Sequence, residues 1–379
     1  MISIWSRRES VPFGPEGAEL MKILIVNPFG IGDVIFSTPL IEVLKTRYPR
    51  SYIGYVCNRR AHEVIKTNPL LGRIFIYEKD DFRVCWQSSR TECVKKIWRF
   101  LNSIRNERFD LSIDLSLGYQ YSMFLKLLGV KKRLGFNYRE RGVFLTDKID
   151  IDGFHDKHVV EYYLDLARLL GIDTAAYKIK PRVYISESEK ARSAGLLKNI
   201  DIQDGELVIG MVPGCGASWG IDAKYRRWDR KNFAALADSL ISKYNAKVIL
   251  FGDAKEMDIC GDVEGMMKSK VINYSGKTTI GDFIGLLTRC GLVITNDGGP
   301  LHMAVGLGVK TVSIFGPVDG AVYGPYPANG VHHIVVAGKK AACRPCYRGF
   351  KYAKCEERTC FDSITVEDVL KASEEILSR

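Results

Sequence analysis

Residues 295–317 read TNDGGPLHMAVGLGVKTVSIFGP, and this stretch gives the strongest indication of the fold. The apolar run LVIT at 292–295 leads into it and predicts a buried strand. A turn with two glycines follows, then an apolar helix pattern, then the β-branched run TVSIF at 311–315. Strand, glycine turn, helix and strand in this order predict parallel strands covered by helices, an α/β fold.

The turn inside this stretch has the composition of an anion-binding site. Gly298 and Gly299 carry no Cβ and therefore let a ligand approach the backbone, while Pro300 suits the first turn of a helix. The free N–H groups and the dipole of such a helix end favour an anion, most naturally a diphosphate, close to His302. The alternative is that Asp297 only caps the helix and that His302 packs; the local pattern leaves both open.

Two further segments begin in the same way. Apolar strands at 22–26 and 207–212 end in the glycine loops NPFGIGD and PGCGAS, and each loop precedes a helix pattern. Further apolar strands at 52–57 and 247–253 continue the alternation. Two such halves predict two Rossmann-like domains whose parallel sheets face a central cleft.

This organisation divides the chain into five parts. Residues 1–20 are expected to be a disordered tail, or an over-extended start with Met21 as the true first residue. The other expected parts are an amino-terminal Rossmann-like domain (21–175), a linker or crossover (176–204), a carboxy-terminal Rossmann-like domain (205–340), and a cysteine cluster with a terminal helix (341–379).

Length and charge narrow the classes of function. The 379 residues suit two domains, and the net charge of +11 favours anionic partners without choosing among them. No apolar run is long enough to span a membrane, and the first twenty residues lack the apolar segment of a secretory signal. No nucleic-acid-binding motif accompanies the positive charge, so we expect no nucleic-acid partner.

The amino-terminal loop carries a carboxylate where a phosphate site would exclude one. Gly30 and Gly32 frame a turn, and Asp33 stands at the start of the helix. Ile35 replaces the third glycine of a dinucleotide fingerprint, which argues against an NAD(P)-dependent dehydrogenase. Asp33 would repel a phosphate, but it is well placed as a general base for an uncharged hydroxyl. Its alternative role is to cap the helix.

The third loop, PGCGASWGIDAKYRRW at 213–228, opens the second half. Ser218 offers a hydroxyl donor, and Lys224 and Arg226 add positive charge within reach of an anion at the 298–302 turn. Each basic residue taken alone is as well explained as a solvated surface charge.

Together these loops resemble the lipopolysaccharide heptosyltransferases, glycosyltransferase family 9, over nearly all of residues 21–379. The motifs that carry the resemblance are MKILIVNPFGIGDVIFSTPLIEVLKTRYP, FDLSIDL, RLGF, H-x-x-E-x-Y at 158–163, VPGCGASW, RRW at 226–228 and TNDGGPLHMAVGLGVKTVSIFGPVD. The resemblance implies a GT-B fold, with the acceptor in the first domain and an ADP-sugar in the second. It also implies an inverting, metal-independent transfer of heptose from ADP-heptose to the inner core of lipopolysaccharide, with no cofactor required.

The resemblance also implies roles for single residues. Asp33 takes the place of the family's general base, and the donor-site residues map to Asp297, Gly299 and His302. The phosphate-binding basic residue maps to Arg226, with Lys224 as the alternative. An acidic residue that can hold the ribose falls on Asp253 or Glu256. Gly298 stands where the family usually has serine or threonine, which removes one hydroxyl donor.

On the acceptor side, the resemblance implies an anionic lipid-linked oligosaccharide and peripheral contact with the cytoplasmic face of the inner membrane. Gly32, Arg59, Arg60 and Arg133 are the expected acceptor-side residues. The basic amphipathic pattern at 91–106 either touches the membrane interface or packs on the sheet.

Four cysteines are clustered near the carboxyl end. Cys343, Cys346, Cys355 and Cys360 have a spacing that permits a structural zinc site. Similar clusters occur in the tails of relatives without metal being needed for transfer, so disulfides and free thiols stay open beside zinc. Two rival functions also stay open: a transferase of the same fold with another nucleotide sugar or acceptor, and a catalytically degenerate nucleotide-sugar-binding protein.

Overall fold

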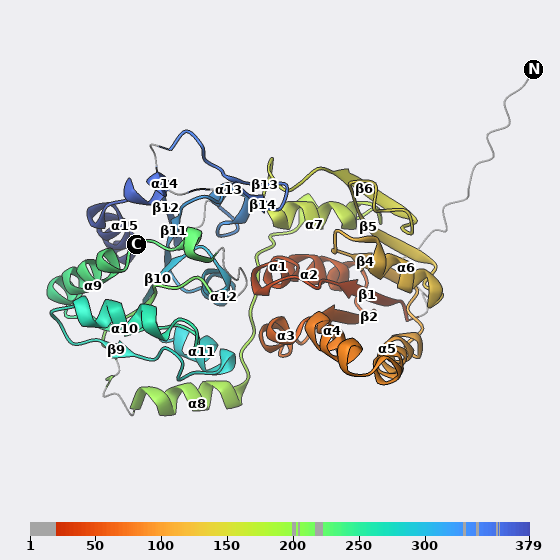
Figure 1. The fold of residues 1–379 in the computed structure, drawn as a ribbon, viewed down its shortest axis with the longest axis horizontal. Helices are drawn as coiled ribbons and strands as arrows, with labels where there is room; N and C mark the ends of the chain where they lie inside the picture. Colours follow the sequence, from red (N-terminus) through yellow and green to blue (C-terminus); the bar gives the residue numbers. More distant parts are fainter. Residues whose placement is uncertain are drawn as a thin grey trace, which may run out of the picture.

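A computed structural model describes residues 20–198, 202–203, 205–216, 223–328, 331–338, 341–353, 355 and 357–379. Across these residues, every helix is too short or too polar to cross a bilayer. Figure 1 shows two α/β domains side by side, with α1 and α12 facing each other where the domains meet.

The first domain is built on one parallel sheet. Its strand order is β3-β2-β1-β4-β5-β6, and the register pairs Lys22 with Tyr52 and Ile23 with Leu111. The strands are β1 (Lys22–Val26), β2 (Tyr52–Cys57), β3 (Arg73–Ile76), β4 (Leu111–Asp114), β5 (Lys132–Tyr138) and β6 (Asp147–Ile151). β1 is almost entirely buried because helices cover both of its faces, as its unbroken apolar run predicts.

Helices α1 to α7 surround this sheet: α1 (Ile31–Phe36), α2 (Thr38–Arg47), α3 (Arg59–Ile65), α4 (Lys79–Ser88), α5 (Arg90–Arg105), α6 (Tyr119–Leu127) and α7 (Val159–Arg168). The sequence pattern suggests one helix over 34–49, but the structure has two, which meet at Ser37. Pro39 lies in the first turn of α2, where its missing N–H breaks no hydrogen bond, so a new helix can begin there.

The second domain repeats the topology of the first. Its sheet has the order β12-β11-β10-β7-β8-β9, with strands β7 (Val208–Val212), β8 (Lys247–Leu250), β9 (Ile272–Asn273), β10 (Leu292–Asn296), β11 (Thr311–Phe315) and β12 (His333–Ala337). Its helices are α9 (Arg230–Tyr244), α10 (Met257–Met266), α11 (Ile280–Leu287), α12 (Gly299–Leu307), α13 (Gly320–Tyr323), α14 (Thr359–Asp362) and α15 (Val366–Ser378). In each sheet, successive strands are added first on one side of the first strand and then on its other side. The point where the strand order reverses lies between β1 and β4 in the first sheet and between β7 and β10 in the second, and open α/β sheets bind ligands at such points.

The carboxy-terminal segment adds one element that the sequence pattern does not reveal. A short antiparallel hairpin, β13 (Tyr347–Arg348) with β14 (Lys351–Tyr352), precedes α14. Thr365 with Asp368 three residues later predicts the capped start of a terminal helix. The structure confirms it, because the two residues form a reciprocal capping box at the start of α15.

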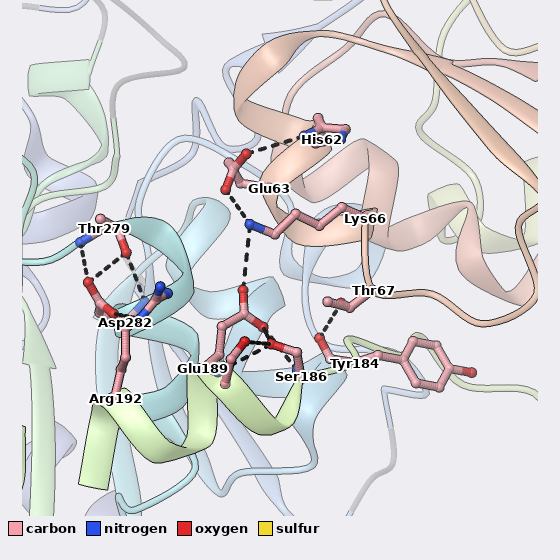
Figure 2. A network of polar contacts seen from close by, with 11 residues as sticks. His62, Glu63, Lys66, Thr67, Tyr184, Ser186, Glu189, Arg192, Thr279 and Asp282 are labelled. Carbon is pink, nitrogen blue, oxygen red and sulfur yellow. Dashed lines mark hydrogen bonds and ion pairs between the residues drawn. The ribbon is translucent and has the colours of Figure 1, made fainter. Parts of the chain in front are cut away.

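The connection between the domains runs through the 3-10 turn η1 (Thr174–Ala176) and α8 (Glu187–Lys198). Figure 2 shows how this connection is held on both sides. Toward the first domain, the Thr67 hydroxyl donates to the Tyr184 carbonyl at 2.7 Å, and Lys66 Nζ lies 3.6 Å from Glu189. Toward the second domain, Arg192 on α8 binds Asp282 on α11 at 3.0 Å. The linker is thus tied by polar contacts to the residues that follow α3 and to α11.

Candidate active site

A cavity of about 690 Å³ lies between the two domains. Loops at the carboxyl ends of both sheets form its wall, as the topology of the strands requires. The lining residues that carry the argument below are Gly32, Asp33, Arg60, Lys79, Arg141, Arg226, Asp297, Gly298, Gly299, His302, Tyr347 and Phe350. Two of the three glycine turns singled out from the sequence, around Gly32 and around Gly298, therefore line one cavity, and the loop after β7 packs against the second of them at Cys215.

Asp33 lies in the first turn of α1 and faces this cavity. The loop before it is held by Asn27, whose side chain donates to the Asp33 carbonyl at 3.0 Å and accepts from the Phe29 N–H at 3.3 Å. Burial raises the pKa of Asp33 from 3.8 to about 6, against backbone hydrogen bonds and the positive charge of Arg226. A carboxylate with this pKa can accept a proton near neutral pH.

Arg226 and Asp297 form a buried ion pair across the second domain's part of the wall. Their side chains are 4% and 3% exposed. Burial raises the pKa of Asp297, while Arg226 acts against that rise. Asp297 Oδ1 is buried and accepts no hydrogen bond from any residue that the structure describes. Asp297 thus holds the guanidinium of Arg226 at the cavity wall, at the entrance to α12.

Asn296, the last residue of β10, fixes the loops around this pair. Its side chain accepts from the Trp228 N–H at 2.9 Å and donates to the carbonyls of Pro213 and Gly214 at 2.8 and 2.9 Å. It is fully buried. One amide therefore ties the glycine loop after β7 to the segment that carries Arg226.

His302 lies in α12 at the contact between the domains. Its ring packs on Phe36 with centroids 4.4 Å apart, and it occupies the space beside Gly32. Burial lowers the pKa of His302 from 6.5 to about 3, with smaller contributions from His158 and Arg226. The imidazole is therefore neutral at physiological pH. Its Nδ1 is buried and forms no hydrogen bond within the described part of the chain.

The neighbourhood of Gly298 explains why glycine stands there. A Cβ at this position would lie 2.2 Å from the carbonyl oxygen of Cys215, in the loop after β7. The loop itself is fixed by Glu256, whose carboxylate accepts from the N–H groups of Cys215 and Gly216 at 2.9 and 3.0 Å. Gly298 is therefore a packing requirement between two loops, and any serine or threonine here would displace one of them.

The structure brings only part of the expected donor-side set to the cavity. Glu256 is buried beneath the glycine loop, and Asp253 is exposed and accepts from the Lys255 N–H at 2.8 Å. Lys224 is exposed, with its Nζ 5.0 Å from the centre of the Tyr225 ring, whereas Arg226 reaches the wall. Ser218 lies outside the described residues.

On the first domain's side, positive charge gathers around Arg60, Lys79 and Arg141, which all line the cavity. Arg59 points elsewhere and binds Asp81 at 2.9 Å. Arg133 is the second residue of β5, near the opposite end of the sheet, where it donates to the carbonyls of Phe144 and Lys131 at 2.7 and 3.0 Å. Arg133 is thus placed away from the cavity, because only the carboxyl ends of the strands face it.

Two features were not selected from the sequence, one behind the cavity wall and one in the wall itself. Asp114 ends β4, accepts from the Ser116 N–H at 2.9 Å, and has its pKa raised to about 7 by burial. Its position in FDLSIDL, at the end of an apolar strand, was the available signal. Tyr347 and Phe350 reach the cavity from the β13–β14 hairpin, for which the sequence gives no periodic pattern.

The four clustered cysteines lie apart from this cavity. They line a second, small cavity of about 20 Å³ beside the hairpin. Each of them carries a free thiol in the structure.

Comparisons with known proteins agree with this geometry. The profile of glycosyltransferase family 9 (heptosyltransferase) matches residues 97–352. Lipopolysaccharide heptosyltransferase 2 of Salmonella typhimurium is 25% identical over 306 residues, which are 78% of this chain and 83% of that protein. The glycosyl transferase family 9 structure from Veillonella parvula has a TM-score of 0.78 at 23% identity and covers 96% of this chain and 99% of its own. E. coli ADP-heptose lps heptosyltransferase II has a TM-score of 0.72 at 21% identity, with 94% and 99% covered. The structural likenesses establish the GT-B fold.

Proposed function

Since the chain belongs to glycosyltransferase family 9 and is a glycosyltransferase, we propose that it transfers heptose from ADP-heptose to an inner-core lipopolysaccharide acceptor. The names of the relatives support this donor and this acceptor. The observation that carries the proposal is the arrangement across the cavity: Asp33, with its raised pKa, belongs to the first domain, while Arg226 and the start of α12 belong to the second.

Asp33 acts as the general base in this proposal. An acceptor hydroxyl attacks the anomeric carbon of the heptose, and the carboxylate of Asp33 takes the hydroxyl proton as the new glycosidic bond forms. The bond from the anomeric carbon to the diphosphate oxygen breaks, and ADP leaves with the electron pair. A single displacement of this kind inverts the anomeric configuration.

The departing diphosphate gains negative charge, and the second domain offers fixed positive charge to meet it. Arg226 is oriented by Asp297, and the N-terminal end of α12 adds its dipole and N–H groups. His302 is neutral and can offer an N–H group without adding charge. Because these groups are built into the fold, we propose that the transfer itself needs no metal ion and no cofactor.

The acceptor side suits an anionic lipid-linked oligosaccharide. Arg60, Lys79 and Arg141 place three positive charges on the first domain's part of the cavity, where carboxylates and phosphates of the acceptor would be neutralised.

We further propose peripheral contact with the cytoplasmic face of the inner membrane through α4 and α5. Val84, Trp86, Val94 and Trp98 are 49–64% exposed on these two helices, and Arg83, Arg90 and Arg99 are exposed on the same helices. Exposed apolar and aromatic side chains with interspersed cations are typical of helices that lie in a membrane interface.

A donor screen tests this function. ADP-heptose, and not a UDP-sugar or NAD, should raise the melting temperature of the protein, and a truncated lipopolysaccharide acceptor should gain the mass of one heptose. Stabilisation by a UDP-sugar alone would favour the alternative, a transferase of the same fold with another donor. Binding of ADP-heptose without product on any inner-core acceptor would favour another acceptor or a degenerate binding protein.

A further inference from the structure

The carboxy-terminal cysteines lie on either side of the β13–β14 hairpin. Cys343 and Cys346 stand in the turn before β13, Cys355 follows β14, and Cys360 lies in α14. The two ligand pairs of many small metal-binding modules have this arrangement, two before and two after a hairpin. A hairpin with two paired residues in each strand is marginal alone and needs further anchoring.

All four cysteines line one cavity of about 20 Å³, which is room for a single water-sized or ion-sized particle. The other described residues of its lining, Tyr225, Pro317, Tyr352, Ala353, Arg358 and Thr359, contribute no carboxylate and no imidazole. The cavity thus offers four thiols as its metal-binding groups, and a metal ion bound there would take them up as thiolates.

Two arginines offer charge compensation beside the cavity. Four thiolates around a divalent ion carry a net charge of −2. Arg358 lines the cavity, and Arg344 lies in the chain between Cys343 and Cys346. Arg344 is fixed by donating to the carbonyls of Gly316 and Gly338 at 2.5 and 2.6 Å. Four neutral thiols would need no such positive charge beside them.

The hairpin that this cluster encloses reaches the active-site cavity. Tyr347 and Phe350 line that cavity, and Phe350 packs on Tyr138 and Phe154 of the first domain with centroids 5.2 Å apart in both pairs. An anchor at the base of the hairpin would therefore hold aromatic side chains at the boundary between the two domains.

We propose that Cys343, Cys346, Cys355 and Cys360 bind one thiophilic divalent metal ion, Zn²⁺ or Fe²⁺, through four thiolates, and that this ion anchors the hairpin against the cleft. Four thiolates in tetrahedral geometry select these metals. In the described part of the chain no three such groups already stand in ligand positions, so the four side chains turn toward the cavity centre on binding. The role is structural and separate from the transfer chemistry.

The test is metal analysis of the full chain purified under reducing conditions and reconstituted with Zn²⁺ or Fe²⁺ in separate samples. We expect about one ion per chain after removal of free metal, and at least a roughly tenfold loss in the C343S/C346S variant. Cys85→Ser, on α4, is the matched control and should keep its full metal content, because Cys85 is remote from the cluster. The sample that retains stoichiometric metal identifies the ion.

A second measurement covers the case in which the double variant fails to fold. In the C85S chain, titration with a mercurial should release the metal in proportion to the reaction of four thiols. Metal below about one-tenth of an ion per chain in both reconstituted samples, metal release unrelated to thiol modification, or two disulfides found by mass spectrometry of the alkylated protein would each overturn the proposal. None of these readouts depends on the sugar donor, so they stand apart from the proposed transfer.

Discussion

The imidazole of His302 fills the space beside Gly32: a Cβ at Gly32 would lie 2.7 Å from the ring carbon Cδ2. These residues belong to different domains and to different glycine turns. Gly32 immediately precedes Asp33, and His302 lies three residues beyond Gly299, so this contact sets the distance between the proposed base and the proposed donor site. Catalysis should therefore respond to a single methyl group placed between them.

Gly32→Ala tests this contact. The added methyl group must displace the ring or separate the domains, so we expect kcat/KM to fall by about 10- to 100-fold with a stability loss of about 1–3 kcal/mol. Steady-state kinetics and thermal unfolding measure both effects. Gly261→Ala in α10 is the control, because a Cβ there meets no atom within 4 Å; it should leave activity unchanged. Full activity in G32A would show that the domain contact is unimportant for transfer.

Asp33→Asn should lower kcat by about 10²- to 10⁴-fold while ADP affinity is nearly unchanged, because only the base is removed. In the wild type, kcat/KM should fall as the pH drops below about 6, the pKa at which Asp33 takes up a proton. Asp114→Asn is the informative comparison. Asp114 also has a raised pKa, but it is absent from the cavity wall, so this variant should keep the midpoint of the profile. A pH profile whose midpoint shifts in Asp114→Asn would contradict the assignment of Asp33 as the base.

The same pKa shift predicts how stability depends on pH. The folded-state pKa of Asp33 is raised, so folding favours the protonated carboxyl, and the stabilisation present below pH 3.8 is lost as the pH rises through about 6. Asp33→Asn avoids this loss. The variant should be more stable than the wild type at pH 8 by about 1–2 kcal/mol, a value reduced by solvent access to the cavity. Denaturant unfolding at pH 8 and pH 4 measures the difference, which should disappear at the lower pH.

Mutations can show whether Arg226 or Lys224 binds the diphosphate of the donor. Arg226→Ala alone would leave Asp297 buried and unpaired at a cost of about 3–5 kcal/mol, so the useful variant is Arg226→Met with Asp297→Asn. The double variant should raise the Kd for ADP by about 10- to 100-fold through the loss of a charge-assisted contact with the diphosphate, measured by calorimetry. Lys224→Ala should change this affinity by less than about twofold, because Lys224 is exposed to solvent. The reverse order would place the diphosphate on Lys224.

The acceptor side is tested by charge removal. Arg60→Gln and Arg141→Gln should each raise the KM for the anionic acceptor by about 3- to 10-fold and weaken its salt dependence, with the donor KM unchanged. Arg59→Gln is the matched control, because Arg59 pairs with Asp81 and does not line the cavity. An equal effect of all three substitutions would indicate general attraction by the basic surface.

Sequence periodicity predicts the parallel sheets well because buried strands such as Lys22–Val26 are continuous apolar runs. The strand Tyr52–Cys57 and the capping box at Thr365 lie where the pattern places them. The division at Ser37 and the β13–β14 hairpin are harder to predict, because a proline in a helix pattern and a strand of two residues leave weak periodic signals.

For the candidate site, the glycine turns were predictable because each follows a strand end, where the topology brings ligands. The role of each charged side chain was not predictable, because it depends on contacts between residues far apart in the sequence. Glu256 lies under a loop 40 residues away in the sequence, and Arg133 lies near the amino end of β5, away from the carboxyl ends that face the cavity. Asn296 joins segments 68 and 83 residues distant, which no local pattern reveals.

The close approach of Gly298 to the Cys215 carbonyl has a consequence for protein engineering. With no room for a hydroxyl at this position, phosphate oxygens near the turn would be met by main-chain groups beside Arg226. These groups respond to shape and charge and are indifferent to the identity of the nucleobase or sugar. Libraries that aim to change the donor should therefore leave residues 214–216 and 298 intact and vary the surfaces that would contact the two ends of the nucleotide sugar.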